Sequence, residues 1–166
     1  MSCSRLLAAA FLENEGHLLL MRRSPSASLM PGMLAPVGGH IEASEINDPT
    51  AACIREITEE TGLSPHEIEK LSLRYIVHRL RHNEVRTQYV YFASTTKVRL
   101  YPNHEGVLQW MPIDALHNLA EASFTTRAIL NHYLKSGSKT ENIYVGVVEG
   151  LNSPPIIHWA ILSDWE

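Results

Sequence analysis

The chain has 166 residues, of which 45% are hydrophobic and 19% charged, which is the composition of one ordinary soluble domain with a buried core. Its 14 Lys and Arg residues against 18 Asp and Glu residues give a formal net charge of −4, and no basic stripe runs along the sequence, which argues against a nucleic-acid polymer as partner. No apolar stretch is long enough to span a membrane.

The N-terminal segment predicts two strands, Arg5–Leu12 and His17–Arg22, joined by a turn at Asn14-Glu15-Gly16. Its apolar run is short, and a turn and a second apolar run follow at once. A strand–turn–strand unit is therefore a better interpretation than a signal peptide. A loop rich in Ser and Pro is expected over Ser24–Gly32, and a short strand over Met33–Val37.

A helix is predicted from about Pro49 to Thr61. Asp48 is a typical N-cap because its carboxylate accepts the unpaired amide hydrogens of the first turn, and Pro49 suits the first helical position because it has no such hydrogen. Gly62 ends the helix. An apolar stripe of Ala51, Ile54 and Ile57 is expected to face the core.

Further elements are predicted downstream from periodicity and capping residues. They are a short helix opened by the capping box Ser64–Glu67, strands at Leu71–Leu80 and Thr87–Ser94 around a turn at His82–Glu84, a shorter strand at Val98–Tyr101, a strand through Trp110–Met111, a helical turn at Pro112–Leu116 and a long helix at Thr125–Leu134. Strands mixed with helices on both sides predict an α/β (α+β) sandwich.

The C-terminal tail predicts an additional hairpin of two strands, Asn142–Gly150 and Ile156–Trp165. Residues 1–137 would then form the main domain, and residues 138–166 an extension of the same domain. Three roles are open for the hairpin: it extends the sheet, covers the site, or pairs with a second subunit in a homodimer. Packing or dimerisation is favoured over catalysis.

The cysteines and histidines point to no transition-metal site. Cys3 and Cys53 give no disulfide framework and fit no zinc spacing, which indicates a reducing, cytoplasmic setting. The nine histidines are scattered, and none forms a pair at four-residue spacing on a predicted helix, so surface or packing roles are favoured.

Glu56, Glu59 and Glu60 are the most informative residues. On a helix of about 3.6 residues per turn they lie within an arc of roughly 100°, where three carboxylates repel one another. A solvated acidic face is the simpler alternative. A hard cation such as Mg²⁺ or Mn²⁺, which takes oxygen ligands and also bridges substrate phosphates, would neutralise the cluster.

The surrounding pattern, Gly39 to Leu63, resembles the Nudix box of the Nudix hydrolase family. Gly39 is followed after five residues by Glu45, and the run Arg55-Glu56-Ile57-Thr58-Glu59-Glu60-Thr61-Gly62-Leu63 matches the second half of the box at every position. Nine residues, instead of the family's seven, separate Glu45 from Arg55, and the addition falls in the loop before the helix. The resemblance implies an α/β/α sandwich with a mixed sheet and a loop-helix-loop box.

The resemblance also implies hydrolysis of a diphosphate with Mg²⁺, or alternatively Mn²⁺, as cofactor. Its ligands would be Glu56, Glu59, Glu60 and the main-chain carbonyl of Gly39, with Arg55 orienting a box carboxylate. The general base stays open between Glu56 and a glutamate outside the box. Glu105 is the first such candidate and Glu84 a weaker one.

Other residues near the box are candidates for substrate binding. Arg22 and Arg23 end a predicted strand and would reach phosphates, unless they are merely exposed. Gly38 and Gly39 would let the backbone approach metal and substrate closely. His40 would touch the substrate. Glu42 is a candidate for supporting the site, Glu45 is expected in a structural ion pair, and Trp110, Tyr89 and Tyr91 would stack a base unless they belong to the core.

The leading functional hypothesis is a hydrolase of nucleoside diphosphate derivatives, with a nucleoside triphosphate as first substrate. ADP-ribose, a dinucleoside polyphosphate and a non-nucleotide diphosphate are alternatives. A hypothesis of another class is a Nudix-like module that senses a nucleotide without turnover. Such modules often lose box carboxylates, whereas all three are present here.

Overall fold

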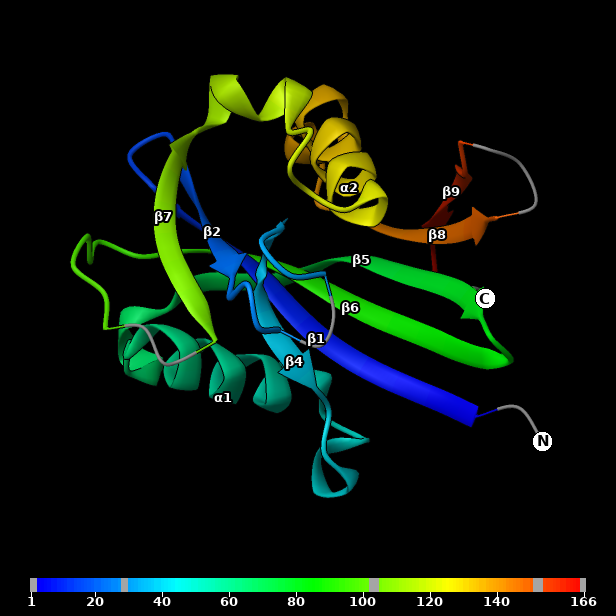
Figure 1. Cartoon of the computed structure of the whole chain (residues 1–166), viewed down its shortest axis with the longest axis horizontal. Coiled ribbons are helices and arrows are strands. Elements are labelled where there is room, and N and C mark those ends of the chain that lie inside the picture. The colour runs from blue at the N-terminus through cyan, green and yellow to red at the C-terminus, as the bar shows by residue number, and fades with distance from the viewer. Residues whose placement is uncertain (1–2, 28–29, 102–104, 151–153, 165–166) are drawn as a thin grey trace.

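The computed structural model describes residues 3–27, 30–101, 105–150 and 154–164, and Figure 1 shows their arrangement. The strands are β1 Cys3–Asn14, β2 His17–Arg23, β3 Leu34–Ala35, β4 Val37–His40, β5 Glu69–Arg81, β6 Glu84–Ser94, β7 Gly106–Pro112, β8 Ile143–Glu149 and β9 Ile156–Leu162. The helices are α1 Pro49–Thr61 and α2 Phe124–Lys135, with short 3-10 helices at Ala43–Glu45, Pro65–Glu67, Ile113–Asn118 and Gly137–Lys139. No helix in these ranges is long and apolar enough to cross a membrane.

The strands form one mixed sheet in the order β3-β2-β1-β6-β5-β8-β9. β1 runs parallel to β6 along almost its whole length, and β5 runs parallel to β8. The other edge of β1 is shared, because β4 pairs with its residues Leu7–Ala10 and β2 pairs only with its end at Glu13–Asn14. β7 pairs with β2. β2 and β4 therefore approach the same strand at different points.

The two helices cover opposite faces of the sheet, α1 below and α2 above in Figure 1. Beneath α2 lies one core cluster, which includes Phe11, Tyr75, Phe92, Ile129 and Leu130. Against α1 lies a second, which includes Leu12, Ala52, Cys53, Ile57 and Tyr91. This layering is the α/β sandwich expected from the sequence.

The helix α1 has the predicted ends. The Asp48 side chain accepts a hydrogen bond from the Ala51 amide at 3.0 Å, and Gly62 ends the helix in the left-handed region at φ 74°. The predicted apolar stripe is right only in part, because Ile57 is buried and Ile54 half-buried, whereas Ala51 is exposed. The buried residues are Ala52, Cys53, Ile57, Glu60 and Thr61. The helix is rotated so that one carboxylate faces inward together with the apolar side chains.

The downstream elements follow the prediction, with one exception. Residues 98–101 form no strand but run as a loop past the end of α1, where the Tyr101 amide donates to the Thr61 carbonyl at 2.8 Å. The Trp110 indole donates to the Val98 carbonyl at 3.0 Å. These bonds replace the strand pairing that the local sequence favours.

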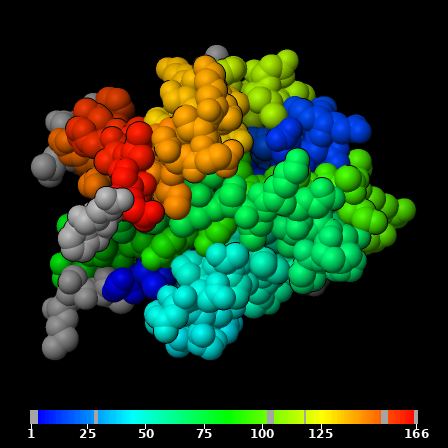
Figure 2. All heavy atoms as spheres, turned by 180° about the vertical axis from the view of Figure 1, so that it is seen from behind, coloured from blue at the N-terminus to red at the C-terminus, as the bar shows by residue number. Residues whose placement is uncertain are grey.

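The C-terminal hairpin of β8 and β9 extends the sheet beyond β5, and Figure 2 shows it beside α2. Ile157 and Trp159 pack against the core cluster beneath α2. The Trp159 ring centre lies 5.2 Å from that of Tyr75 and 4.9 Å from that of His132. The hairpin therefore completes the α2 side of the core.

Candidate functional site

Arg55 joins the loop before α1 to the helix itself. Its guanidinium donates to both carboxylate oxygens of Glu45, at 2.8 and 2.9 Å, and to the His40 carbonyl at 2.9 Å. It also donates to Glu56 at 2.8 Å and to Glu59 at 3.1 Å. The Arg55 hydrogen bonds hold the pKa of Glu45 at about 2. The longer loop thus leaves Glu45 within reach of Arg55, as a structural ion pair.

Glu56 lies against the backbone of Gly39. A Cβ on Gly39 would come within 2.6–2.7 Å of the Glu56 carboxylate atoms, so any side chain there would displace this carboxylate. The preceding residue, Gly38, has φ 144°, and a Cβ there would collide with the Ala8 carbonyl oxygen. The two glycines therefore let β4 lie close to α1 and to β1 at the same time.

Glu60 is a buried carboxylate, with only 2% of its surface exposed. Its Oε2 accepts a hydrogen bond from the Gly38 amide at 2.6 Å. Burial raises the pKa of Glu60 to about 8, and the nearby charges of Glu105 and Glu56 add to the rise, against the lowering effect of the Gly38 amide. Burial likewise raises the pKa of Glu56, against the opposing effect of Arg55.

The same electrostatic contacts place Glu105 beside this pair, since its charge acts on both Glu56 and Glu60. Glu105 stands immediately before β7, and its carbonyl accepts a hydrogen bond from the Ser24 amide at 2.8 Å. Glu105, from a distant segment, thus lies beside the two glutamates of α1 that contact the Gly38–Gly39 backbone. Glu59, in contrast, has 55% of its side chain exposed.

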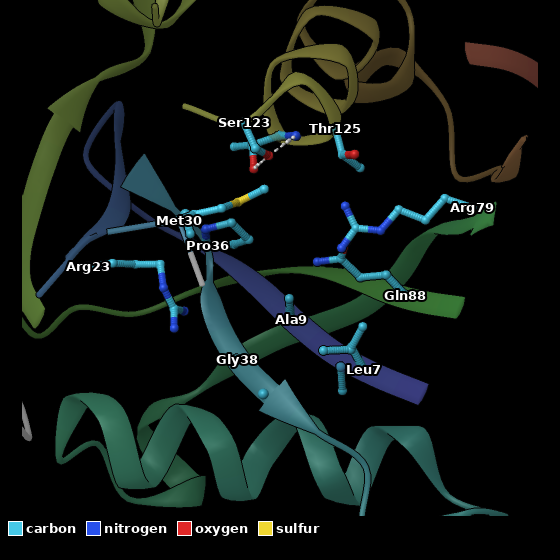
Figure 3. Close-up of a pocket in the computed structure, with 14 residues that line it drawn as sticks. Leu7, Ala9, Arg23, Met30, Pro36, Gly38, Arg79, Gln88, Ser123 and Thr125 are labelled. Carbon is cyan, nitrogen blue, oxygen red and sulfur yellow. Dashed lines mark hydrogen bonds between the residues drawn. The ribbon is translucent and has the colours of Figure 1, made fainter. Parts of the chain in front are cut away.

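A cavity open to solvent lies on the other side of β4. Figure 3 shows it between the sheet and the start of α2, with Arg23 on one side and Arg79 and Gln88 on the other. Its lining residues are Leu7, Ala8, Ala9, Arg23, Met30, Ala35, Pro36, Gly38, Gly39, Arg79, Gln88, Ser123, Thr125 and Thr126. Gly38 and Gly39 border both the cavity and the glutamate cluster, although none of the described glutamates lines the cavity.

Comparison with known proteins agrees with this geometry. Residues 4–133 match the family model described as the NUDIX domain. The chain belongs to the Nudix hydrolase family. It is accordingly a hydrolase that acts on pyrophosphate bonds.

Solved structures share the fold at low sequence identity. The MutT protein from Bacillus halodurans aligns with a TM-score of 0.70 at 16% identity, over 95% of this chain and 97% of its own. The MutT protein from Methanosarcina mazei Go1 gives 0.70 at 18% identity, over 81% and 95% of the two chains. An Ap4A hydrolase from C. elegans gives 0.63 at 15% identity, over 83% and 99%. The search of curated proteins found no match.

Nudix hydrolases generally use divalent metals such as Mg²⁺, and the carboxylate oxygens here suit such a cation. Within the part of the chain that the structure describes, no three His, Cys, Asp or Glu side chains already form a metal-binding group. Arg55 donates hydrogen bonds to the carboxylates of Glu56 and Glu59, and the Gly38 amide donates one to Glu60. A bound cation would draw these carboxylates away from their present partners, and it would offset the repulsion that raises the Glu56 and Glu60 pKa values.

Only some of the residues predicted from the sequence to bind substrate lie at the cavity. Gly38, Gly39 and Arg23 line the cavity. Arg22 does not line it, because its guanidinium is bound to Glu121 at 2.7 Å and to the Gly32 carbonyl at 3.0 Å. His40 is exposed at the end of β4, 3.3 Å from the Arg5 guanidinium.

Two of the other candidates have structural partners. Glu84 forms ion pairs with Arg5 and Arg86. Glu42 belongs to the loop before α1, where its amide donates to the Glu45 carboxylate at 3.0 Å.

Sequence reasoning missed the far wall of the cavity. Arg79, Gln88, Met30 and Ser123 come from four separate segments, none of them in the Nudix box. The one signal available was strand alternation, which puts Arg79 on the same face of β5 as the buried Val77 and Tyr75. Alternation does not say which strands are neighbours, so it could not bring Arg79 and Gln88 to one site.

Proposed function

We propose that this Nudix hydrolase cleaves the diphosphate linkage of a nucleoside diphosphate derivative with the help of Mg²⁺, and that a nucleoside triphosphate is its first candidate substrate. The observation that carries the proposal is that Glu56 and Glu60 lie against the Gly38–Gly39 backbone with Glu105 beside them, and that the same two glycines border an open cavity. ADP-ribose, a dinucleoside polyphosphate and a non-nucleotide diphosphate are the alternative substrates.

The metal ligands in this proposal are Glu56, Glu59, Glu60 and the Gly39 carbonyl. The cation supplies charge neutralisation for the phosphates and lowers the pKa of a bound water. Arg55 holds the loop and the helix in one geometry, which keeps Glu56 oriented toward Gly39. Gly38 and Gly39 let phosphate oxygens approach the backbone, and Arg23 is placed to bind them from the cavity side.

The general base is Glu56 or Glu105. Glu56 has a pKa raised by burial, which brings a carboxylate nearer to the range in which it accepts a proton from water at neutral pH. Glu105 lies outside the box, next to the same cluster. Replacing each by Gln separately distinguishes them, because loss of the base lowers kcat at saturating Mg²⁺, whereas loss of a ligand is partly recovered by added metal.

The test is a panel of nucleoside triphosphates, ADP-ribose, dinucleoside polyphosphates and non-nucleotide diphosphates, assayed for pyrophosphate or phosphate release with Mg²⁺. Glu59→Gln and Glu60→Gln should each lower kcat/KM by about a hundredfold or more. Asp164→Ala is the matched control, since this exposed carboxylate makes no hydrogen bond or ion pair with any described residue. Unchanged release in both Glu variants contradicts the proposal, and tight nucleotide binding without turnover supports a sensing module instead.

A cytoplasmic setting and assembly into a homodimer remain predictions. The first rests on the absence of a disulfide framework in the sequence, and fractionation tests it. The second rests on the exposed outer strand β9, and sedimentation tests it.

A further inference from the structure

Three arginines lie side by side on the sheet next to the cavity. Arg5, Arg86 and Arg79 are direct cross-strand partners on β1, β6 and β5, so their side chains leave the same face. This face is the one covered further along by α2, because Leu7 and Gln88, two residues inward on β1 and β6, line the cavity. We refer to Arg5, Arg86 and Arg79 as the arginine row.

The charge of the arginine row is poorly balanced. Glu84 is the only carboxylate that the described residues bring into contact with it, through ion pairs with Arg5 and Arg86. Arg81 on β5 adds a fourth guanidinium that acts on Arg79. Like charges opposite one another on a sheet face are destabilising. The arginine row is therefore a local concentration of positive charge in a chain whose net charge is negative.

Arg79 is the member that faces the cavity. It is half-buried, and among the described residues it makes no hydrogen bond or ion pair. Burial, with the charges of Arg86 and Arg81, lowers its pKa. Gln88 lines the cavity beside it, and its amide has no hydrogen-bond partner in the described part of the chain. Figure 3 shows the two side chains together on the side of the cavity opposite Arg23.

Two polar side chains that make no hydrogen bond with the described residues line one solvent-open cavity and are backed by excess positive charge, an arrangement that suits an anion. A guanidinium binds phosphate and carboxylate through two parallel hydrogen bonds. A phosphate monoester, with a charge of about −1.5 to −2, matches several guanidiniums better than a single carboxylate does. None of the lining residues that the structure describes is aromatic, so these residues offer no ring for stacking a base.

We propose that the arginine row, through Arg79, binds a phosphate group on the organic part of the substrate, remote from the diphosphate that is cleaved. This inference rests on the proposed function and narrows its substrate class to diphosphates whose organic moiety carries an additional phosphate. Gly38 on β4 and Arg79 on β5 lie on opposite sides of the cavity. β1 and β6 separate these strands by roughly 14 Å across the sheet, and the register sets Gly38, opposite Ala9, four residues or about 13 Å along the strands from Arg79, which aligns with Arg5. The two phosphorylated ends of one substrate would span this separation, with the long Arg79 side chain covering part of it.

The experiment compares kcat/KM for matched pairs: ADP-ribose with its 2′-phosphate, and a nucleoside triphosphate with its 3′-phosphate. The wild type should prefer the phosphorylated member of at least one pair by about tenfold or more. Arg79→Gln should remove that preference by lowering kcat/KM of the phosphorylated member about tenfold to a hundredfold, with the other member unchanged. Arg99→Gln is the control, because it removes one charge from an exposed residue that does not line the cavity.

Two further readouts separate binding from folding. The midpoint of thermal unfolding should stay the same or rise in Arg79→Gln, because the arginine has no described hydrogen bond or ion pair to lose and its repulsion with Arg86 and Arg81, which outweighs the attraction of Glu84, disappears. Calorimetric titration of the same pairs without metal should show tighter binding of the phosphorylated member to wild type alone. Equal kcat/KM and equal affinity within every pair overturn the inference, and so does a uniform loss in Arg79→Gln. If nothing is hydrolysed but the binding preference holds, the proposed function fails and this inference stands.

Discussion

Glu60 is a carboxylate kept away from water, and its ionisation is therefore coupled to folding. Its pKa in the folded protein is about 8, against an ordinary value of 4.5. Below about pH 4.5 it is protonated in both the folded and the unfolded chain. Between there and about pH 8 the unfolded chain ionises while the folded chain resists, so the free energy of unfolding falls as pH rises.

We expect the metal-free protein to lose stability between about pH 5 and pH 8, by up to about 1.4 kcal/mol per pH unit. Denaturant unfolding in a chelating buffer at several pH values measures this slope. Glu60→Gln should flatten it, and Mg²⁺ should do the same in the wild type by favouring the ionised form. A slope that is equal in wild type and Glu60→Gln would show that Glu60 titrates normally.

The glycine pair of β4 offers a second prediction on single residues. In Gly39→Ala the new methyl group contacts only the carboxylate end of the Glu56 side chain. The backbone therefore keeps its place, and the carboxylate is displaced. A displacement of about 1 Å at a reacting centre can cost about a hundredfold in rate, and we expect a loss of kcat/KM of this order with little change in unfolding midpoint. Gly38→Ala is the contrasting variant, since its methyl group meets rigid backbone at a positive φ and should chiefly lower stability.

At the scale of elements, α1 shows what local chemistry determines. The N-cap Asp48 and the left-handed Gly62 act within one turn of the chain, and both helix ends follow from them. The side that α1 buries depends instead on β4, a distant partner whose glycines admit Glu56 and Glu60. The spacing of apolar residues therefore predicted Ala51 on the buried side of α1, whereas Ala52 and Cys53 are buried in the structure.

The N-cap of α1 can be removed without touching the carboxylates. Asp48→Ala should lower stability by about 1 kcal/mol and the unfolding midpoint by about 2–4 °C. Turnover at low temperature should stay near the wild-type value, because the glutamates keep their positions on the helix. Calorimetry checks this against Asp164→Ala, and equal midpoints in the two variants would mean that the Asp48 hydrogen bond contributes nothing.

The whole molecule explains why the box could be predicted and the cavity could not. The box is continuous in sequence, so its spacing could be compared with a family directly. The cavity is made where β1 meets β6, which joins Leu7 to Gln88, and where α2 returns over them. Such pairings lie some 80 residues apart, and no local periodicity determines them. The residues proposed to select the substrate are therefore the ones that needed a structure.

The C-terminal hairpin is part of the same whole. Trp159 stands over Gly146 and between Tyr75 and His132, so Trp159→Ala should lower the free energy of unfolding by about 2 kcal/mol or more. His158→Ala, the next residue, removes only an exposed ion pair with Glu149 and should change stability by less than about 1 kcal/mol. Urea unfolding measures both, and similar losses would mean that the hairpin does not support the core.

Cys53 lies in the buried face of α1, and burial raises the pKa of its thiol to about 12. A thiol reagent reacts only with the ionised, accessible sulfur, so labelling needs α1 to detach from the sheet. In a Cys3→Ser background, where Cys53 is the remaining cysteine, the labelling rate would measure how often α1 detaches. Mg²⁺ and substrate should slow it, since both would tie the helix to β4, and unequal slowing by different ligands would rank them without any turnover being followed.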